Sequence, residues 1–314
     1  MKETIFLINH SVENCGVYQY GKRVAGVLNK SENYNFKYLE LNDFEVFMTH
    51  VNEDKPTVII YNHLTGTMPW FTNDTSQIIR GMGIKQGLLV HNVNYETFFD
   101  FYLHQDPNYQ DNENNYHILR PLFEYDVPED QDGSIIRIGT FGFGFKVKEY
   151  DKICEMVNND FANDSVELNL HLTISHFCPN EDVINQLRRQ CVDKITNPNI
   201  KLNITTEFMT DRGVLDFLNK NDLNVFFYHK YTSYNGISSV IDYALSAKKP
   251  IAICKSNMFS HIWDTQPSIC VEDNNLKTIL SNGFGSLNGK YNEWSNENFI
   301  KNVETTIKKI KKYV

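Results

Sequence analysis

Short apolar runs alternate along the chain with segments in which apolar residues recur at helical spacing. The runs at 5–8, 57–61 and 87–90 have the length and the β-branched content of buried strands. Helical spacing follows at 18–28 and again at 182–194. Buried strands that alternate with helices predict parallel sheets covered by helices, and therefore an α/β protein.

The stretch 224–254 is the clearest unit of this kind. It has an apolar run at 225–228, a polar loop at 230–236, and then apolar residues at helical spacing, which are Ile237, Val240, Ile241, Ala244 and Leu245. Pro250 ends the helical pattern, and 251–254 is a second apolar run. The stretch predicts a strand, a helix and a second, parallel strand.

The loop in this unit is a candidate ligand site, because ligands of open parallel sheets bind at the carboxyl ends of the strands. Gly236, Ser238 and Ser239 stand where the helix begins, and unpaired amide groups with the positive end of the helix dipole suit a phosphate there. Asp242 follows one turn later and could accept hydrogen bonds from sugar hydroxyls.

The length of 314 residues suits two domains of about 150 residues each. The best linker is the polar segment 127–133, which contains Pro128 and Gly133. We therefore predict a first domain at 1–130 and a second at 131–296. The segment 297–314 has the pattern of an amphipathic helix with lysines near its end.

Composition narrows the class of protein. The net charge of −9 gives no general attraction to nucleic acid, so the bulk charge argues against a nucleic-acid partner. No apolar run is long enough to span a membrane, and the first residues form a strand pattern and not a signal peptide. The six cysteines show no CxxC pairing, which indicates reduced thiols in a cytoplasmic protein with neither disulfides nor a zinc site.

The segment SSVIDYALSAKKPIAI resembles the nucleotide-sugar half of GT-B glycosyltransferases, especially the retaining group called family 4. That family carries two acidic residues eight positions apart around a helix start, followed by a proline before the next strand. Asp242 corresponds to the second acid and Pro250 to the proline, whereas Tyr234 stands in the place of the first acid. The run CGVYQYGKRVAGVL, which follows the first strand, resembles the first loop and helix of the same enzymes and contains Gly16.

The resemblance implies two facing Rossmann-like domains with parallel sheets and a cleft between them. The first domain would bind the acceptor, the second the nucleotide sugar, and the C-terminal helix would cross back to the first domain. The family's second domain begins with a strand, a glycine, commonly an arginine, and a lysine before the next helix. Here Thr140 takes the place of the arginine, Lys148 best fits the lysine, and Lys146 is the alternate.

The resemblance also implies a function: transfer of a sugar from a nucleoside-diphosphate sugar, with retention and without a metal or other cofactor. Asp242 would bind the ribose and Lys148 the diphosphate. The loop residues Gly236, Ser238 and Ser239 would add amides, and Gly16 would approach the phosphates from the first domain. His91, which follows the strand at 87–90, would lie near the transferred sugar as a catalytic residue, with His63 beside it. The acceptor, a glycan, a lipid-linked molecule or a small molecule, is not indicated.

Three other functions stay open. A nucleotide-sugar epimerase of the same fold would release a changed sugar nucleotide without an acceptor. A non-catalytic nucleotide-sugar-binding protein would agree with Thr140 and Tyr234 in the places of an arginine and an acid, and any measured turnover would exclude it. Glycosylation of modified DNA is the least favoured, because the chain is acidic.

Overall fold

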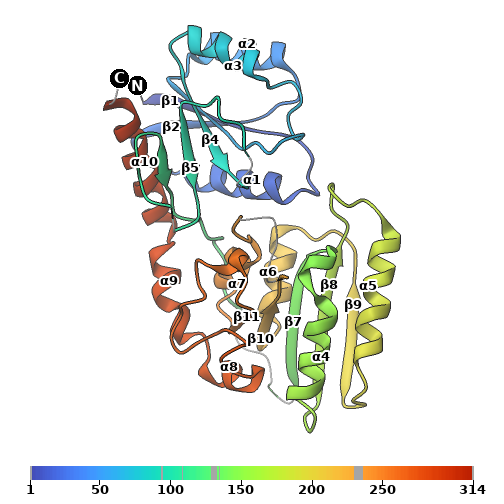
Figure 1. The fold of residues 1–314 in the computed structure, drawn as a ribbon. Helices are drawn as coiled ribbons and strands as arrows, with labels where there is room; N and C mark the ends of the chain where they lie inside the picture. Colours follow the sequence, from blue (N-terminus) through green and yellow to red (C-terminus); the bar gives the residue numbers. More distant parts are fainter. Residues whose placement is uncertain are drawn as a thin grey trace. The chain divides into compact units, whose positions relative to one another are not determined.

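The computed structural model describes residues 2–92, 95–107, 109–128, 133, 135–229 and 236–312. The chain forms two compact units. Unit 1 contains Met1–Pro121 and Trp294–Val314, and unit 2 contains Leu122–Glu293. Each unit has one sheet in which all the paired strands are parallel, which confirms the α/β prediction (Figure 1).

Unit 1 has the strand order β2-β1-β3-β4-β5-β6. Its strands are β1 (Glu3–Asn9), β2 (Tyr34–Glu40), β3 (Val58–Tyr61), β4 (Lys85–Val90), β5 (Phe101–His104) and β6 (Asn115–His117). Its helices are α1 (Gly16–Leu28), α2 (Phe44–Asp54), α3 (Asn73–Gly81) and α10 (Asn296–Lys312). The last helix therefore belongs to the first unit, although it follows the whole of unit 2 in the chain.

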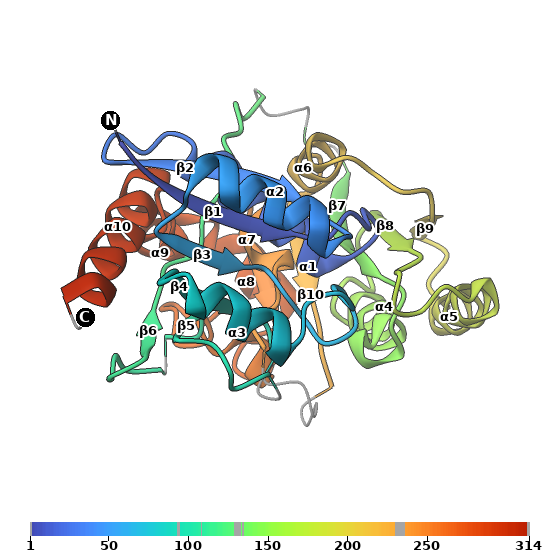
Figure 2. The same ribbon diagram turned by 90° about the horizontal axis from the view of Figure 1, so that it is seen from above.

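Successive side chains of β1 point to opposite faces of this sheet, and different helices cover the two faces. Ile5 and Leu7 pack in one core with residues of α1 and α10, whereas Phe6 and Ile8 pack in another core with residues of α2 and α3. Figure 2 shows α2 and α3 together on one side of the sheet. Both faces are buried, which explains why the strands are continuous apolar runs.

Unit 2 has the strand order β11-β10-β7-β8-β9. Its strands are β7 (Ile136–Phe143), β8 (Val166–Thr173), β9 (Ile200–Thr205), β10 (Leu223–Phe226) and β11 (Ile251–Ile253). Its α-helices are α4 (Tyr150–Asp160), α5 (Glu181–Lys194), α6 (Asp211–Asn219), α7 (Val240–Ser246), α8 (Leu276–Asn282) and α9 (Asn288–Glu293). Helices α4 and α5 lie on one face of β7–β9, and α6 lies on the other (Figures 1 and 2).

The division between the units falls at Pro121 and Leu122, earlier than the predicted boundary at 130. Two hydrogen bonds tie the following segment to unit 2: the amide of Phe123 donates to Ser246 Oγ at 2.9 Å, and the Tyr125 hydroxyl donates to Asp216 at 3.0 Å. At the other end, unit 1 resumes at Trp294 and not at 297. Polar composition alone could not reveal these contacts.

Two other segments have a local structure that their sequence does not indicate. The glycine-containing run 139–148 continues β7 as far as Phe143 and ends in a short 3-10 helix, Lys146–Lys148. Of the run 116–123, only the first two residues lie in a strand, β6, and β5 precedes it. All six cysteines are free thiols. Within the described part of the chain, no helix combines the length and apolar character needed to cross a bilayer.

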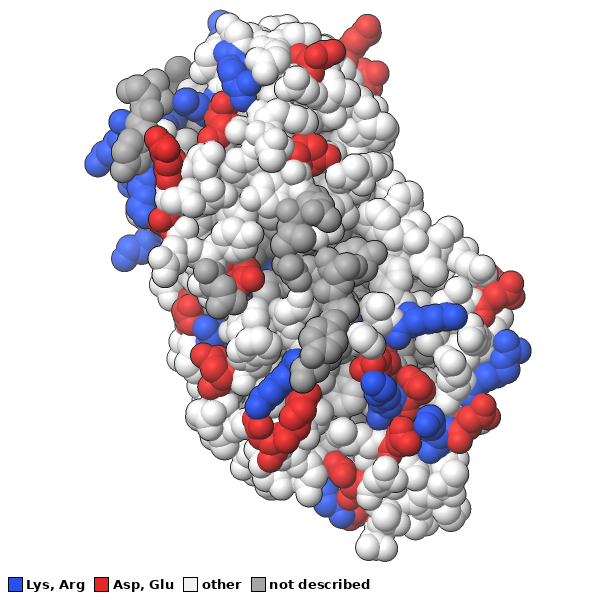
Figure 3. All heavy atoms as spheres, in the orientation of Figure 1, with Lys and Arg blue, Asp and Glu red and all other residues white. Residues whose placement is uncertain are grey.

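The lysine cluster of α10 is partly neutralised within unit 1. Lys309 pairs with Asp111 at 2.7 Å, and Lys311 pairs with Glu3. Elsewhere on the face drawn in Figure 3, positive and negative side chains are interspersed. Two of the four lysines at 308–312 therefore help to hold α10 to its own unit.

Candidate functional site

In the sheet of unit 2, the direction in which successive strands are added reverses at β7. From β7 the chain passes through α4 to β8 on one side, whereas β10 lies on the other side of β7 and leads through α7 to β11. Crevices at such switch points, outside the carboxyl ends of the strands, are where open α/β sheets bind ligands. The loops after β7 and β10 carry most of the residues predicted for the nucleotide sugar.

Lys148 is the buried cation of this region. It ends the 3-10 helix before α4, and only 6% of the residue is exposed. Its Nζ lies 5.3 Å from the centre of the Tyr228 ring, which follows β10. Burial lowers the pKa of Lys148 to about 7, because a charged ammonium group loses its hydration there. We call Lys148, Tyr228, Tyr150, Ser238 and Gly142 the lysine–tyrosine cluster.

Gly142 makes room for the Lys148 side chain. A Cβ atom at position 142 would lie 2.2 Å from Lys148 Nζ and 3.1 Å from the Tyr150 hydroxyl. The φ angle of Gly142 is 152°, in the region that favours glycine. The Tyr150 hydroxyl donates to the carbonyl of Phe143 at 3.0 Å, which holds the Tyr150 ring in place beside Lys148.

We expect Gly142→Ala to reduce activity much more than stability. The added methyl group meets the end of a flexible side chain, so the ammonium group can move away, but it then no longer occupies its place beside Tyr228. Steady-state rates and thermal unfolding of Gly142→Ala, with Gly133→Ala as the control, would measure this. No residue that the structure describes lies within 4 Å of a Cβ at Gly133. Equal loss of activity in both variants would contradict the expectation.

The loop after β10 brings the predicted serines to the same cluster, but in unequal roles. The hydroxyl groups of Tyr228 and Ser238 are hydrogen-bonded to each other. The Ser238 amide donates to the carbonyl of Met258 at 3.1 Å, so it is already engaged and is not the open amide that was expected. Ser239 is partly exposed at the start of α7, and Gly236 is partly exposed before it.

Asp242 is completely buried in the first turn of α7. A side chain with no exposed surface meets a ligand only if its surroundings move. The structure therefore supports a positioning role at the start of α7 better than direct contact with ribose, and the ribose contact stays a prediction. Tyr234, in the place of the family's first acid, lies outside the described residues.

Two other positions before α4 were considered for a cation, Lys146 and the place of the family's arginine at Thr140, and their surroundings differ from those of Lys148. Lys146 is exposed, two residues earlier in the same 3-10 helix. Thr140 is buried inside β7 and does not lie in the loop. Lys148 is therefore the predicted cation that the fold places against the tyrosines.

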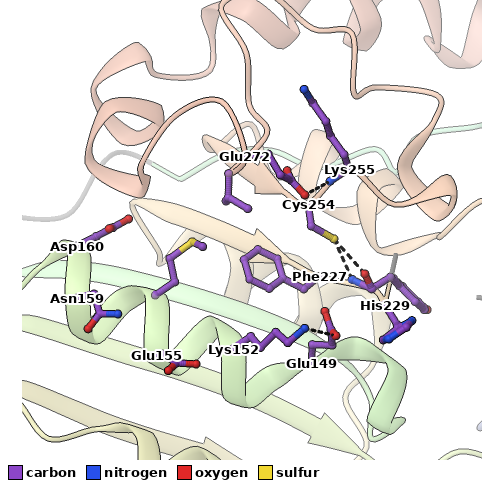
Figure 4. A pocket seen from close by; sticks show the side chains of 13 residues that line it. Glu149, Lys152, Glu155, Asn159, Asp160, Phe227, His229, Cys254, Lys255 and Glu272 are labelled. Atoms are coloured by element: carbon purple, nitrogen blue, oxygen red, sulfur yellow. Dashed lines mark hydrogen bonds and ion pairs between the residues drawn. The ribbon is translucent and has the colours of Figure 1, made fainter. Parts of the chain in front are cut away.

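A cavity of about 610 Å³ lies beside this cluster in unit 2. Its walls come from α4 and from the residues after β10 and β11, and it shares only Tyr228 with the lysine–tyrosine cluster. Figure 4 shows Lys152 directed at Glu149, and Glu272 accepting from the Lys255 amide. The His229 amide donates to the Val147 carbonyl at 2.7 Å, which ties one wall to the segment that carries Lys148.

In unit 1 the polar residues gather at the carboxyl ends of β1, β3 and β4. His91 follows β4 and is partly exposed, and its Nε2 lies 2.7 Å from Asn62 Oδ1. Asn62 follows β3 and donates to Asn9 Oδ1 at 2.8 Å and to the Val17 carbonyl at 2.7 Å. Asn9, at the end of β1, donates to the Tyr18 carbonyl at 3.0 Å. We call Asn9, Asn62 and His91 the amide–histidine cluster.

The electrostatic surroundings keep His91 neutral. Burial, followed by the positive charge of Arg120 and by the neighbouring histidines His63 and His10, lowers the pKa of His91 to about 3. The pKa of His63 is also lowered by burial, although Glu96 lies 3.5 Å from its Nδ1 and opposes the shift. His91 is therefore a hydrogen-bonding group at physiological pH and not a charged one.

Gly16 is exposed at the first position of α1, where it was predicted. The residue before it, Cys15, makes no side-chain cap to the helix. Trp70 is partly buried and packs against the core on the α2 side, and its indole donates to the Leu41 carbonyl at 3.1 Å. The prediction that Gly16 approaches the phosphates stays a prediction.

Several residues in or beside these clusters were not expected from the sequence: Asn9, Asn62, Arg120, Tyr20, Tyr150 and Tyr228. Asn9 and Asn62 each come directly after an apolar run, which is the only sequence signal for them. Arg120 has no such signal. It is almost completely buried, lies 4.9 Å from the centre of the Tyr20 ring, and donates to Gln105 at 3.2 Å.

Two Rossmann-like units with parallel sheets, the first completed by the C-terminal helix, define the GT-B fold of glycosyltransferases. Solved structures with this fold are similar over almost the whole chain. Trehalose-6-phosphate synthase, described in a study of glycosyl transfer with retention, has a TM-score of 0.66 and 8% identity over 99% of both chains.

Two further structures show the same similarity. HepE of Anabaena in complex with UDP-glucose has a TM-score of 0.60 and 11% identity, over 98% of this chain and 99% of that one. The lipopolysaccharide outer core galactosyltransferase WaaB has a TM-score of 0.59 and 10% identity, over 97% and 99%. By sequence, no known protein family and no curated protein matches the chain. The predicted GT-B fold is confirmed, and the predicted cleft stays a prediction.

Proposed function

We propose that this protein is a glycosyltransferase that moves a sugar from a nucleoside-diphosphate sugar to an acceptor, with retention and without a metal. The observation that carries the proposal is the buried Lys148 at the switch point of a GT-B second unit. Among the described residues no carboxylate is paired with Lys148, and burial disfavours its charged form, so a bound anion would stabilise the ammonium group. A diphosphate is such an anion.

The neighbours of Lys148 suit a diphosphate leaving group. The Tyr228 and Ser238 hydroxyls lie in the same cluster, and hydroxyl groups donate to phosphate oxygens. Charge builds on the diphosphate as its bond to the sugar breaks, and a fixed cation stabilises that charge most strongly in a water-poor site. Lys146, which is exposed nearby, is the second candidate for a cation.

The proposed reaction needs no pair of catalytic carboxylates. The acceptor oxygen attacks the anomeric carbon from the face that the diphosphate leaves, the bond from that carbon to the phosphate oxygen breaks, and the acceptor's proton passes to the departing phosphate. In this scheme Lys148 stabilises the leaving group, and His91 binds the transferred sugar as a neutral hydrogen-bonding group. The structural neighbours named for retaining transfer and for UDP-glucose support the donor class.

Donor binding should weaken as the pH rises above about 7. Below that pH Lys148 is already protonated; above it, binding of the anionic donor must take up a proton, at a cost of about tenfold in affinity per pH unit. Calorimetry with UDP-glucose in buffers of different ionisation enthalpy would detect this uptake. Lys148→Arg, which stays charged throughout, should give a flat profile. An unchanged slope in that variant would assign the proton to another group.

A screen for products tests the proposed function directly. The protein is incubated with UDP, GDP, ADP and TDP sugars, first alone and then with candidate acceptors, and the nucleotide and the sugar are analysed by NMR. Release of nucleoside diphosphate with a new glycosidic bond of unchanged anomeric configuration supports the proposal. An altered sugar nucleotide without acceptor would indicate an epimerase, and binding without any turnover a binding protein. Loss of activity with a chelator would contradict the metal-free reaction.

A further inference from the structure

The two buried amides of the amide–histidine cluster have only one possible orientation. Asn62 Nδ2 faces the Val17 carbonyl, and Asn9 Nδ2 faces the Tyr18 carbonyl. A backbone carbonyl can only accept, so each of these contacts requires the NH₂ side of the amide. The Asn62 carbonyl oxygen must therefore point at His91 Nε2, at 2.7 Å.

We propose that Asn62 is a positioning residue that holds His91 as the neutral tautomer with hydrogen on Nε2, so that Nδ1 is the acceptor offered to a hydroxyl group of the sugar. An amide oxygen has no hydrogen to give, so the hydrogen in this contact belongs to the imidazole. The Tyr20 ring packs edge-on against the His91 ring, with the ring centres 5.5 Å apart, and this contact limits the orientation of the imidazole. The proposal rests on the proposed function only for the ligand, not for the tautomer.

The packing around Asn62 shows that it cannot easily turn. Asn9 and Asn62 are both completely buried. Asn9 Oδ1 accepts from the His10 amide at 3.0 Å as well as from Asn62, and Asn9 Nδ2 also donates to the Tyr38 hydroxyl at 2.9 Å. Gly21 of α1 lies directly over both amides, since a Cβ there would be 2.3 Å from Asn62 Nδ2 and 2.8 Å from Asn9 Nδ2.

The charged and titratable groups that act on His91 come from three other elements. They are His10 after β1, His63 after β3 and Arg120 after β6. Arg120 opposes a positive charge on the ring, as do the two histidines when they are protonated. An uncharged imidazole with a lone pair on Nδ1 suits a hydroxyl donor and offers nothing to a phosphate or carboxylate. The cluster therefore selects the uncharged part of a ligand.

The tautomer can be measured without any substrate. Long-range nitrogen–proton NMR of the whole protein with labelled histidine should show His91 as the Nε2–H form, unchanged over about pH 5 to 8, where an ordinary histidine changes its charge. The control is Gln86→Leu, which removes another completely buried amide, one that donates to the Ser76 carbonyl and does not contact His91. A spectrum of the Nδ1–H form, or of an imidazolium ion in this range, would overturn the proposal.

Substitution of Asn62 separates positioning from folding. In Asn62→Asp the carboxylate should favour the imidazolium form and raise the pKa of His91 by about one to three units. With a donor sugar, kcat/KM should then fall at least about tenfold and gain a new ionisation in its pH profile. An unchanged His91 spectrum in Asn62→Asp and Asn62→Leu would refute the role. The expected tautomer in a protein that transfers no sugar would refute the proposed function instead.

Discussion

Lys148→Met should lower kcat by about 10²- to 10³-fold, the effect found when one preorganised donor to a developing charge is removed. Methionine keeps most of the length and apolar volume of the lysine stem, so the cluster with Tyr228 and Tyr150 stays filled while the ammonium group is lost. Affinity for the donor should fall less than kcat, since the leaving group gains charge chiefly in the transition state. Single-turnover rates and donor affinity by calorimetry give the two quantities.

The matched control is Lys146→Met, two residues earlier in the same 3-10 helix and exposed. It should change kcat by only a few fold, and a comparable loss in both variants would show that general positive charge matters and the buried position does not. Stability gives an independent check. Because the pKa of Lys148 is lowered to about 7 in the folded protein, the unfolded chain binds the extra proton between that pH and its own pKa of about 10.4. Wild-type stability should therefore rise with pH through this range, and Lys148→Met should lose that rise.

The sequence was most informative where burial alone decides the structure. Continuous apolar runs gave β1, β3, β4 and β10, and the helical spacing after Ile237 gave α7, because strands covered on both faces need apolar residues throughout. Helix α2 has both a cap and apolar residues at helical spacing, Phe44, Phe47, Met48 and Val51, whereas α3 has little more than its cap as a signal. Asp43 accepts from the amides of Glu45 and Val46, and Thr72 forms a capping box with Thr75. The first turn of α3, Asn73 to Ser76, is polar and conceals its short apolar face.

The candidate site was only partly predictable, because its geometry depends on contacts between residues far apart in the chain. The resemblance around position 148 identified Lys148, but its burial depends on Gly142, which lies within β7 and which no local pattern connects with Lys148. His91 was predicted from its position after a strand. That it is neutral and oriented depends on Asn62, and Asn62 is oriented by a carbonyl of α1. No local pattern encodes such a chain of hydrogen bonds.

Two glycines of α1 offer the sharpest test of this hydrogen-bonded chain. Gly21→Ala should destabilise unit 1 by about 2 to 3 kcal/mol, because the methyl group meets short, fully buried amides that have no room to move. Gly26→Ala, in the same helix, should stabilise the protein by about 0.5 to 1 kcal/mol, since no other described part of the chain lies within 4 Å of the added Cβ and alanine favours the helix. Chemical denaturation of both variants gives the comparison.

The difference in function should follow the difference in packing. In Gly21→Ala the displaced Asn62 no longer accepts from His91, so kcat/KM should fall by more than the loss of folded protein explains, and the His91 signal should lose its single tautomer. In Gly26→Ala both should match the wild type. If Gly21→Ala were as stable and as active as Gly26→Ala, the amides of Asn9 and Asn62 could not be packed as tightly as described, and His91 would need another explanation for its orientation.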